Sequence, residues 1–223
     1  MRKHAFRFIF LTTLCAAGAA FAQTPSSERT DSPRQAWLQV NLNSDMSTMN
    51  GGLQVLAQNI GDDAPSASAV GRHRDGIGAN GAQASAPAIK EETGFDPVRN
   101  RSELIIFAFE RAVIQTQIDL AYFYRNEAEF AGTAYHERGG WRAYRGNNLV
   151  GQGWFSPNSP EGVLRLEIVA HAPFDRLELF ATPYVTESGV EIEPGLILTD
   201  SSDFLIEHIA YRAANEALAA AAR

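Results

Sequence analysis

The feature that most constrains the fold is a series of short runs in which apolar and polar residues alternate, with turn-forming residues between the runs. Successive side chains of a β-strand point to opposite faces of a sheet, so a two-residue repeat is typical of strands that bury one face. The clearest runs are residues 104–109 and 113–123, which are joined by residues 110–112. Residues 145–148 have the composition of a hairpin turn. Predicted strands recur at a spacing of roughly 8–12 residues, which is typical of a sandwich or barrel.

These runs predict an all-β domain over residues 36–212. Residues 59–87 are rich in Gly, Ala, Ser and Asp, and we expect them to form a long loop. Strong helix propensity appears only in residues 213–223, which we expect to be a helical or frayed tail. The remaining predicted strands are residues 37–42, 53–57, 141–144, 149–155, 163–168, 174–180, 191–199 and 204–211.

The N-terminus has the three parts of a cleavable secretory signal. Residues 1–7 carry three basic side chains, residues 8–20 are mostly apolar, and residues 20–22 read Ala-Phe-Ala, the small-x-small pattern of a cleavage site. The alternative is a membrane anchor, but a membrane core of ~30 Å needs about 20 apolar residues. We therefore expect residues 1–22 to be removed and the protein to be exported, to the periplasm or outside the cell. The polar, Pro- and Ser-containing residues 23–35 are expected to be a flexible leader.

Cysteine content and charge exclude several classes of site and partner. Cys15 is the only cysteine and lies in the predicted signal, so the mature chain has no disulfide, thiol nucleophile or thiolate metal site. Removal of the three basic residues of the signal changes the formal charge from −7 to −10. An acidic chain without a basic cluster is a poor binder of nucleic acid. We expect neither a nucleic-acid partner nor a membrane span.

Five short segments carry a further signal, at residues 75–81, 95–109, 141–168, 172–184 and 201–211. In this order they resemble the all-β modules of large bacterial surface adhesins of the repeats-in-toxin kind. The resemblance covers residues 53–211 and implies a jelly-roll-like β-sandwich that binds carbohydrate, with calcium as the expected ion. This chain departs from the family pattern at residues 145–148, where Arg-Gly-Asn-Asn replaces an acidic turn, and it holds one module rather than an array.

Calcium needs six to eight oxygen ligands, which carboxylates and free backbone carbonyls supply. Asp75 lies in a glycine-rich stretch, Glu103 precedes the strongest predicted strand, and Asp203 precedes the last one. First and last strands can be neighbours in a sandwich, so these three acids are the predicted Ca²⁺ ligands. The alternative is that they are solvated loop acids, because the chain lacks the acidic spacing of an EF-hand loop.

Exposed aromatic rings are the predicted ligand-binding groups, since a flat ring face can stack on the apolar C–H groups of a sugar. The candidates are Trp141, Tyr144, Trp154 and Tyr184. Trp141 and Tyr144 differ in parity and should face opposite sides of their strand, as should Trp154 and its neighbour Phe155. The alternative is that aromatic residues belong to the core.

Motifs of catalytic sites are absent from the sequence. His136-Glu137 and Glu207-His208 are acid–imidazole pairs without the spacing of a zinc site, and no G-x-S-x-G elbow occurs. We therefore expect a protein that is not an enzyme. The leading hypothesis is an exported binding module for glycan or cell-envelope material. The alternatives are a non-catalytic structural or matrix protein of the cell envelope and, third, a small hydrolase.

Overall fold

The computed structural model is described over five ranges of the chain, all within one compact unit of residues 35–223. The predicted signal, the leader and residues 215–223 of the predicted tail lie outside the described residues. Within the described part of the chain, no helix is long and apolar enough to cross a membrane. The described ranges are residues 37–42, 49–50, 52–81, 91–193 and 202–214.

The domain is all-β, as predicted, and one short 3₁₀ turn, η1 (Ala67–Ala69), accompanies the strands that the structure describes. The strands are β1 (Leu38–Asn41), β2 (Met49–Asn50), β3 (Leu53–Gln58), β4 (Val70–His73), β5 (Gly76–Ala79), β6 (Phe95–Asp96), β7 (Arg101–Ser102), β8 (Leu104–Ala121), β9 (Ala128–Phe130), β10 (Thr133–Tyr135), β11 (Gly139–Arg145), β12 (Asn148–Phe155), β13 (Val163–Ala181) and β14 (Leu205–Ala213).

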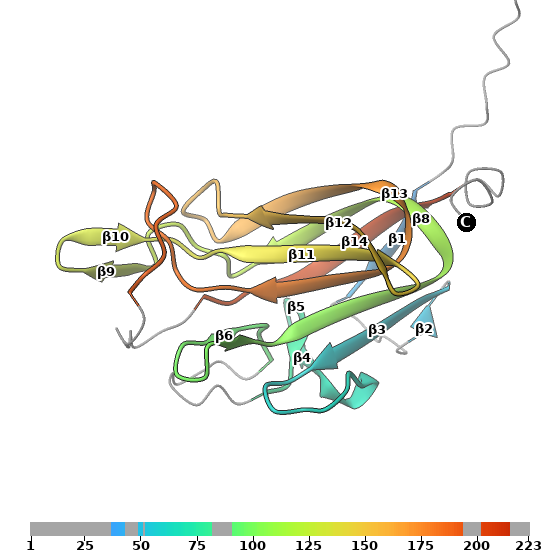
Figure 1. The fold of residues 1–223 in the computed structure, drawn as a ribbon, viewed down its shortest axis with the longest axis horizontal. Coiled ribbons are helices and arrows are strands. Elements are labelled where there is room, and N and C mark those ends of the chain that lie inside the picture. The colour runs from blue at the N-terminus through green and yellow to red at the C-terminus, as the bar shows by residue number, and fades with distance from the viewer. Residues whose placement is uncertain (1–36, 43–48, 51, 82–90, 194–201, 215–223) are drawn as a thin grey trace, which may run out of the picture. The chain divides into compact units, whose positions relative to one another are not determined.

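Ten of these strands form one sheet that folds over on itself into two layers (Figure 1). The first layer follows the order β12–β11–β13–β8–β3, and the second contains β13, β8 and β14, with β1, β5 and β4 attached to β14 or to each other. β8 and β13 belong to both layers, because each is long enough to pass from one to the other. Strands that change layer at a bend are the usual corner of a sandwich whose sheets cross.

The passage between layers occurs near the middle of β8 and β13. In β8, residues 104–109 pair with β3, whereas residues 113–121 pair with β14. The pairing of β13 with β8 shifts register between Val169 and Phe174, as a bulged, bent strand does. The sequence predicts two separate strands in each of these stretches. The structure instead has one continuous strand in each, because the backbone bends without leaving the sheet.

The core lies between the two layers and draws apolar residues from both. Phe107, Leu177 and Leu179 point inward from the first layer, and Ile118 and Ile209 point inward from the second. Aromatic rings fill both ends of this space. One group joins Phe109 with Phe174 and Tyr211, and the other joins Phe123 with Phe155 and Phe204.

Residues 59–81, the described part of the predicted loop 59–87, are not a long loop without secondary structure, and residues 82–87 lie outside the described residues. The stretch contains η1 and the β4–β5 hairpin, and all four residues of β5 are buried. The glycines permit close packing of backbones here: a methyl group on Gly78 would lie 2.0 Å from the carbonyl oxygen of Glu91. Glycine therefore marks a tight contact in this segment rather than a mobile one.

Candidate functional site

The outer face of the first layer carries a row of apolar groups that crosses three strands. Gly140 of β11 pairs with Trp154 of β12 on one side and with Phe180 of β13 on the other, so all three share one face. A methyl group on Gly140 would lie 2.5 Å from Phe180 Cζ and 2.9 Å from Trp154 Cζ3. The missing side chain therefore lets the two rings meet edge to face, with their centroids 6.0 Å apart.

Arginine side chains brace both rings. The guanidinium of Arg138 lies 4.9 Å from the ring centroid of Trp154, and that of Arg142 lies 4.5 Å from the centroid of Phe180. Arg138 is itself held by Glu191 and by Thr182 Oγ1, which accepts from its Nε at 2.8 Å. Trp154 as a residue is nevertheless 64% exposed. Its ring is therefore both accessible to solvent and held in one orientation by its contacts with Arg138 and Phe180.

The same face continues toward the hairpin end with a second stack. The guanidinium of Arg176 lies 4.2 Å from the ring centroid of Tyr144. Glu178 sits between the two neighbouring cations, with Oε1 3.3 Å from Arg176 Nε and Oε2 4.0 Å from Arg142 Nη1. We call the residues Arg138, Arg142, Tyr144, Trp154, Arg176 and Phe180 the arginine–aromatic face.

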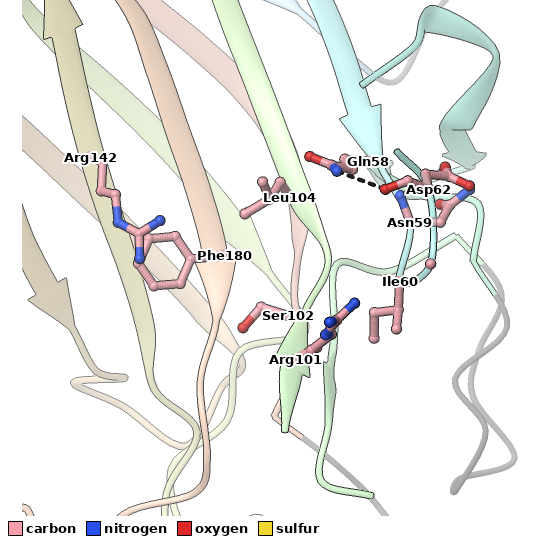
Figure 2. A pocket seen from close by; sticks show the side chains of 10 residues that line it. Gln58, Asn59, Ile60, Asp62, Arg101, Ser102, Leu104, Arg142 and Phe180 are labelled. Carbon is pink, nitrogen blue, oxygen red and sulfur yellow. Dashed lines mark hydrogen bonds between the residues drawn. The ribbon is translucent and has the colours of Figure 1, made fainter. Parts of the chain in front are cut away.

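A groove of about 270 Å³ opens at one side of this face. Figure 2 shows Arg142 and Phe180 along one wall, Leu104 between the walls, and the turn after β3 along the other. That turn is stiffened by Asp62, whose Oδ2 accepts from the backbone N–H of Asn59 at 3.2 Å and whose carbonyl accepts from the Gln58 amide at 2.9 Å. The groove is lined by Gln58, Asn59, Ile60, Gly61, Asp62, Arg101, Ser102, Leu104, Arg142 and Phe180.

The groove combines an apolar floor with a polar rim. Leu104 and Phe180 supply apolar surface, while Arg101 and Arg142 supply hydrogen-bond donors and Asp62 supplies acceptors. Ligand pockets are typically apolar surfaces with a few fixed polar groups. The arrangement suits a ligand that has both apolar and hydrogen-bonding faces, and the exposed ring of Trp154 extends the surface across the sheet.

The four aromatic residues predicted from the sequence are divided by the structure. Trp154 and Tyr144 lie on the arginine–aromatic face. Trp141 packs against the core cluster, over the glycines of β12: a methyl group on Gly153 would lie 2.7 Å from its Nε1. Tyr184 is only 3% exposed, so its ring face is not offered at the surface. The opposite orientations predicted for Trp154 and Phe155 are confirmed, since Phe155 is buried.

The three predicted calcium ligands have separate sets of contacts. Asp75 accepts a hydrogen bond from the Tyr122 hydroxyl at 2.7 Å and from Arg74 Nε at 2.9 Å, and these bonds lower the pKa of its carboxyl. Glu103 is buried and accepts from the backbone N–H of Gly94. Asp203 donates its backbone N–H to Glu137. Among the described residues, His, Cys, Asp and Glu side chains form no group of three or more able to hold a metal.

The adjacent residues His136 and Glu137 point into different structural networks. His136 Nδ1 accepts the backbone N–H of Asn126 at 3.0 Å, and its Nε2 lies 2.7 Å from Glu187. Glu137 is buried and accepts backbone N–H groups of Tyr124 and Asp203. Both side chains thus hold loops at this end of the domain.

The sequence did not point to Arg101, Arg142, Gly140 or Phe180. A usable signal was present, because Arg142 and Tyr144 alternate on one strand, as do Arg176, Glu178 and Phe180 on another. A glycine inside a strand also marks close approach of neighbouring groups. Which strands are neighbours is a tertiary property, so alternation alone does not place these residues together.

No protein-family model matches the chain, and no curated protein matches it. Among solved structures the chain is similar to the C-terminal domain of a chitobiase from Bacteroides fragilis, with a TM-score of 0.29 and 16% sequence identity. The match covers 50% of this chain and 63% of that domain, less than two thirds of its length. A similarity this low says nothing about function.

Proposed function

We propose that the domain is an exported, non-catalytic binding module, and that its ligand is a glycan bound across the arginine–aromatic face and the adjoining groove. The proposal rests chiefly on one observation: Trp154 is 64% exposed although Arg138 and Phe180 contact its ring. A held ring loses little conformational freedom when a ligand stacks on it, which favours binding.

The extent of the surface favours an elongated ligand. Neighbouring strands lie about 4.8 Å apart, so the distance from Trp154 on β12 to Gln58 on β3 corresponds to four strand spacings, roughly 19 Å. Aromatic groups occur at one end of this distance and hydrogen-bonding groups at the other. A sugar chain has apolar C–H faces and hydroxyl edges in alternation, and it fits both kinds of surface.

Replacement of the exposed indole tests this function. Trp154→Ala should weaken binding of a glycan ligand by about tenfold or more, since buried tryptophans at binding sites are commonly worth more than 1 kcal/mol. A glycan array of the mature protein would identify the ligand, and titration calorimetry would compare the variants. The proposal would be contradicted if the protein bound none of the glycans on the array.

Trp37→Ala is the matched control. Trp37 is 37% exposed and also lies beside an arginine, with Arg212 5.6 Å from its ring centroid, but it precedes β1, whose partner strand β14 belongs to the second layer. The control should bind like the wild type. If both variants lost the same amount of glycan affinity, the effect would be a general one of removing a surface tryptophan, and the assignment of the site would be contradicted.

A structural role in the cell envelope is the second candidate. β12 is the last strand on its side of the sheet path, so its outer edge can pair with another chain. If this role is correct, the protein should self-associate as its concentration rises, and it should bind no glycan on the array. Stabilisation by calcium remains a prediction. It is tested by comparing the melting temperature of the protein in millimolar calcium with that in a chelator.

A further inference from the structure

The groove beside Phe180 carries more positive charge than the rest of this acidic protein would suggest. The chain has a formal charge of −7, yet the ionisable side chains that line the groove are Arg101, Arg142 and Asp62. Asp62 is already engaged, because its carboxylate accepts the backbone N–H of Asn59. The two guanidinium groups of the groove therefore outnumber its one carboxylate.

Arg101 has no ion pair within the described part of the chain. Its side chain is exposed at the start of the segment that leads into β8, and Figure 2 shows it extending toward the groove between Ser102 and the turn after β3. Arginines elsewhere in the domain are mostly paired: Arg99 with Asp96, Arg165 with Asp119, and Arg138 with Glu191. An unpaired guanidinium beside a groove is a ready site for a ligand anion.

Arg142 approaches the groove from the opposite wall. Stacking on Phe180 fixes the plane of its guanidinium, and the nearest carboxylate oxygen, on Glu178, is 4.0 Å from Nη1. Glu178 lies closer to Arg176, at 3.3 Å. Arg142 thus keeps donor capacity for a group bound in the groove, and a stacked arginine presents its N–H groups at the edge of the plane.

We propose that the ligand is an acidic glycan, whose carboxylate or sulfate group binds between Arg101 and Arg142 while a neighbouring sugar ring lies on the apolar surface of Leu104, Phe180 and Trp154. This inference rests on the proposed glycan-binding function and specifies its substrate class. The hydroxyl groups of a neutral sugar would accept only uncharged hydrogen bonds from the surroundings of these two arginines, or single hydrogen bonds from the arginines themselves. An anionic substituent adds charge-assisted hydrogen bonds, which are about twice as strong as neutral ones.

Three hexasaccharides separate the possibilities: a hexamer of galacturonic acid, a sulfated cello-hexamer and the unsubstituted cello-hexamer. Each is titrated into the mature protein by calorimetry at low and at physiological salt. At least one anionic hexamer should bind about tenfold more tightly than the neutral one, and this advantage should shrink as salt rises. Comparison of the two anionic hexamers shows whether carboxylate or sulfate is preferred.

Arg101→Gln and Arg111→Gln form the matched pair of variants. Both arginines are exposed, and their side chains make no ion pair or hydrogen bond in the described part of the chain, but Arg111 lies at the bend of β8, away from the groove. Arg101→Gln should weaken binding of the anionic hexamer about tenfold and binding of the neutral hexamer much less, because glutamine keeps hydrogen-bond donors but loses the charge. Arg111→Gln should change neither.

Two results would overturn the inference. If the neutral hexamer binds as tightly as both anionic ones, or if Arg101→Gln behaves like Arg111→Gln, the groove is not an anion site and the proposed glycan-binding function stands without it. If none of the three hexamers binds and the glycan array is also silent, the proposed function fails together with the inference.

Discussion

At the scale of single residues, buried charges in this protein are held by hydrogen bonds. Asp96 is the clearest case, with a fully buried side chain. Its Oδ1 accepts the backbone N–H groups of Val98 and Arg99 at 2.8 and 3.0 Å, and Arg99 Nη1 donates to Oδ2 at 2.8 Å. Burial by itself would raise the pKa of this carboxyl, but the backbone bonds and the guanidinium outweigh burial and lower it.

Asp96→Asn should therefore reduce stability in a pH-dependent way. A carboxyl with a lowered pKa in the folded state stabilises above its unfolded pKa of about 3.9, and this contribution is lost as the pH falls through the folded pKa. We expect a cost on the order of 1 kcal/mol at pH 7, because the amide keeps one acceptor but loses the charge. The cost should shrink below about pH 4. Urea denaturation at several pH values measures it.

Asp63→Asn is the control for that series. Asp63 is exposed and has no hydrogen bond or ion pair within the described residues. Its replacement should change stability by less than about 0.5 kcal/mol at every pH. A cost of Asp96→Asn that stays constant from pH 7 to pH 3 would contradict the role given to its charge.

At the scale of elements, the β11–β12 hairpin shows how a local signal specifies a local structure. Arg145 pairs with Asn148, which leaves Gly146 and Asn147 as a two-residue turn, as predicted. Gly146 has φ +56°, and a methyl group on it would meet no atom within 4 Å. Its backbone N–H donates to Asp175 Oδ1 at 3.0 Å. The need for glycine here comes from the backbone angle and not from crowding.

Gly146→Ala and Gly146→Asn separate these two causes. Alanine should lower the free energy of unfolding by about 1–2 kcal/mol, because a Cβ disfavours positive φ. Asparagine tolerates this region and should lower the free energy of unfolding by less. Chemical denaturation compares the two. If asparagine, the larger residue, were the more costly one, crowding rather than backbone angle would be the cause.

At the scale of the whole molecule, the two layers share two strands, so neither layer should unfold alone. β8 and β13 pair with each other along both halves, from Ile105 with Leu179 to Ala121 with Val163. Phe174 lies where β13 passes between the layers and is fully buried, with its ring 6.0 Å from that of Phe109. A cavity at this point weakens contacts of both layers.

Phe174→Ala should cost about 3–5 kcal/mol while unfolding stays a single transition. Tryptophan fluorescence and far-UV circular dichroism should give the same midpoint in denaturant. The control is Val169→Ala in the same strand, where a side chain 62% exposed should be worth less than about 0.5 kcal/mol. Midpoints that separate between the two probes would mean that the layers unfold independently.

The sequence by itself determined the all-β class, the hairpin at residues 145–148 and the opposite orientations of Trp154 and Phe155, because a two-residue repeat and a positive-φ glycine are local requirements. Only the tertiary structure decided that β8 and β13 bend without ending and that residues 59–81 hold a buried hairpin. The position of the groove also follows from the tertiary structure alone. Arg101, Leu104, Arg142 and Phe180 come from separate segments, and they meet because strand order and register depend on contacts between residues far apart in the chain.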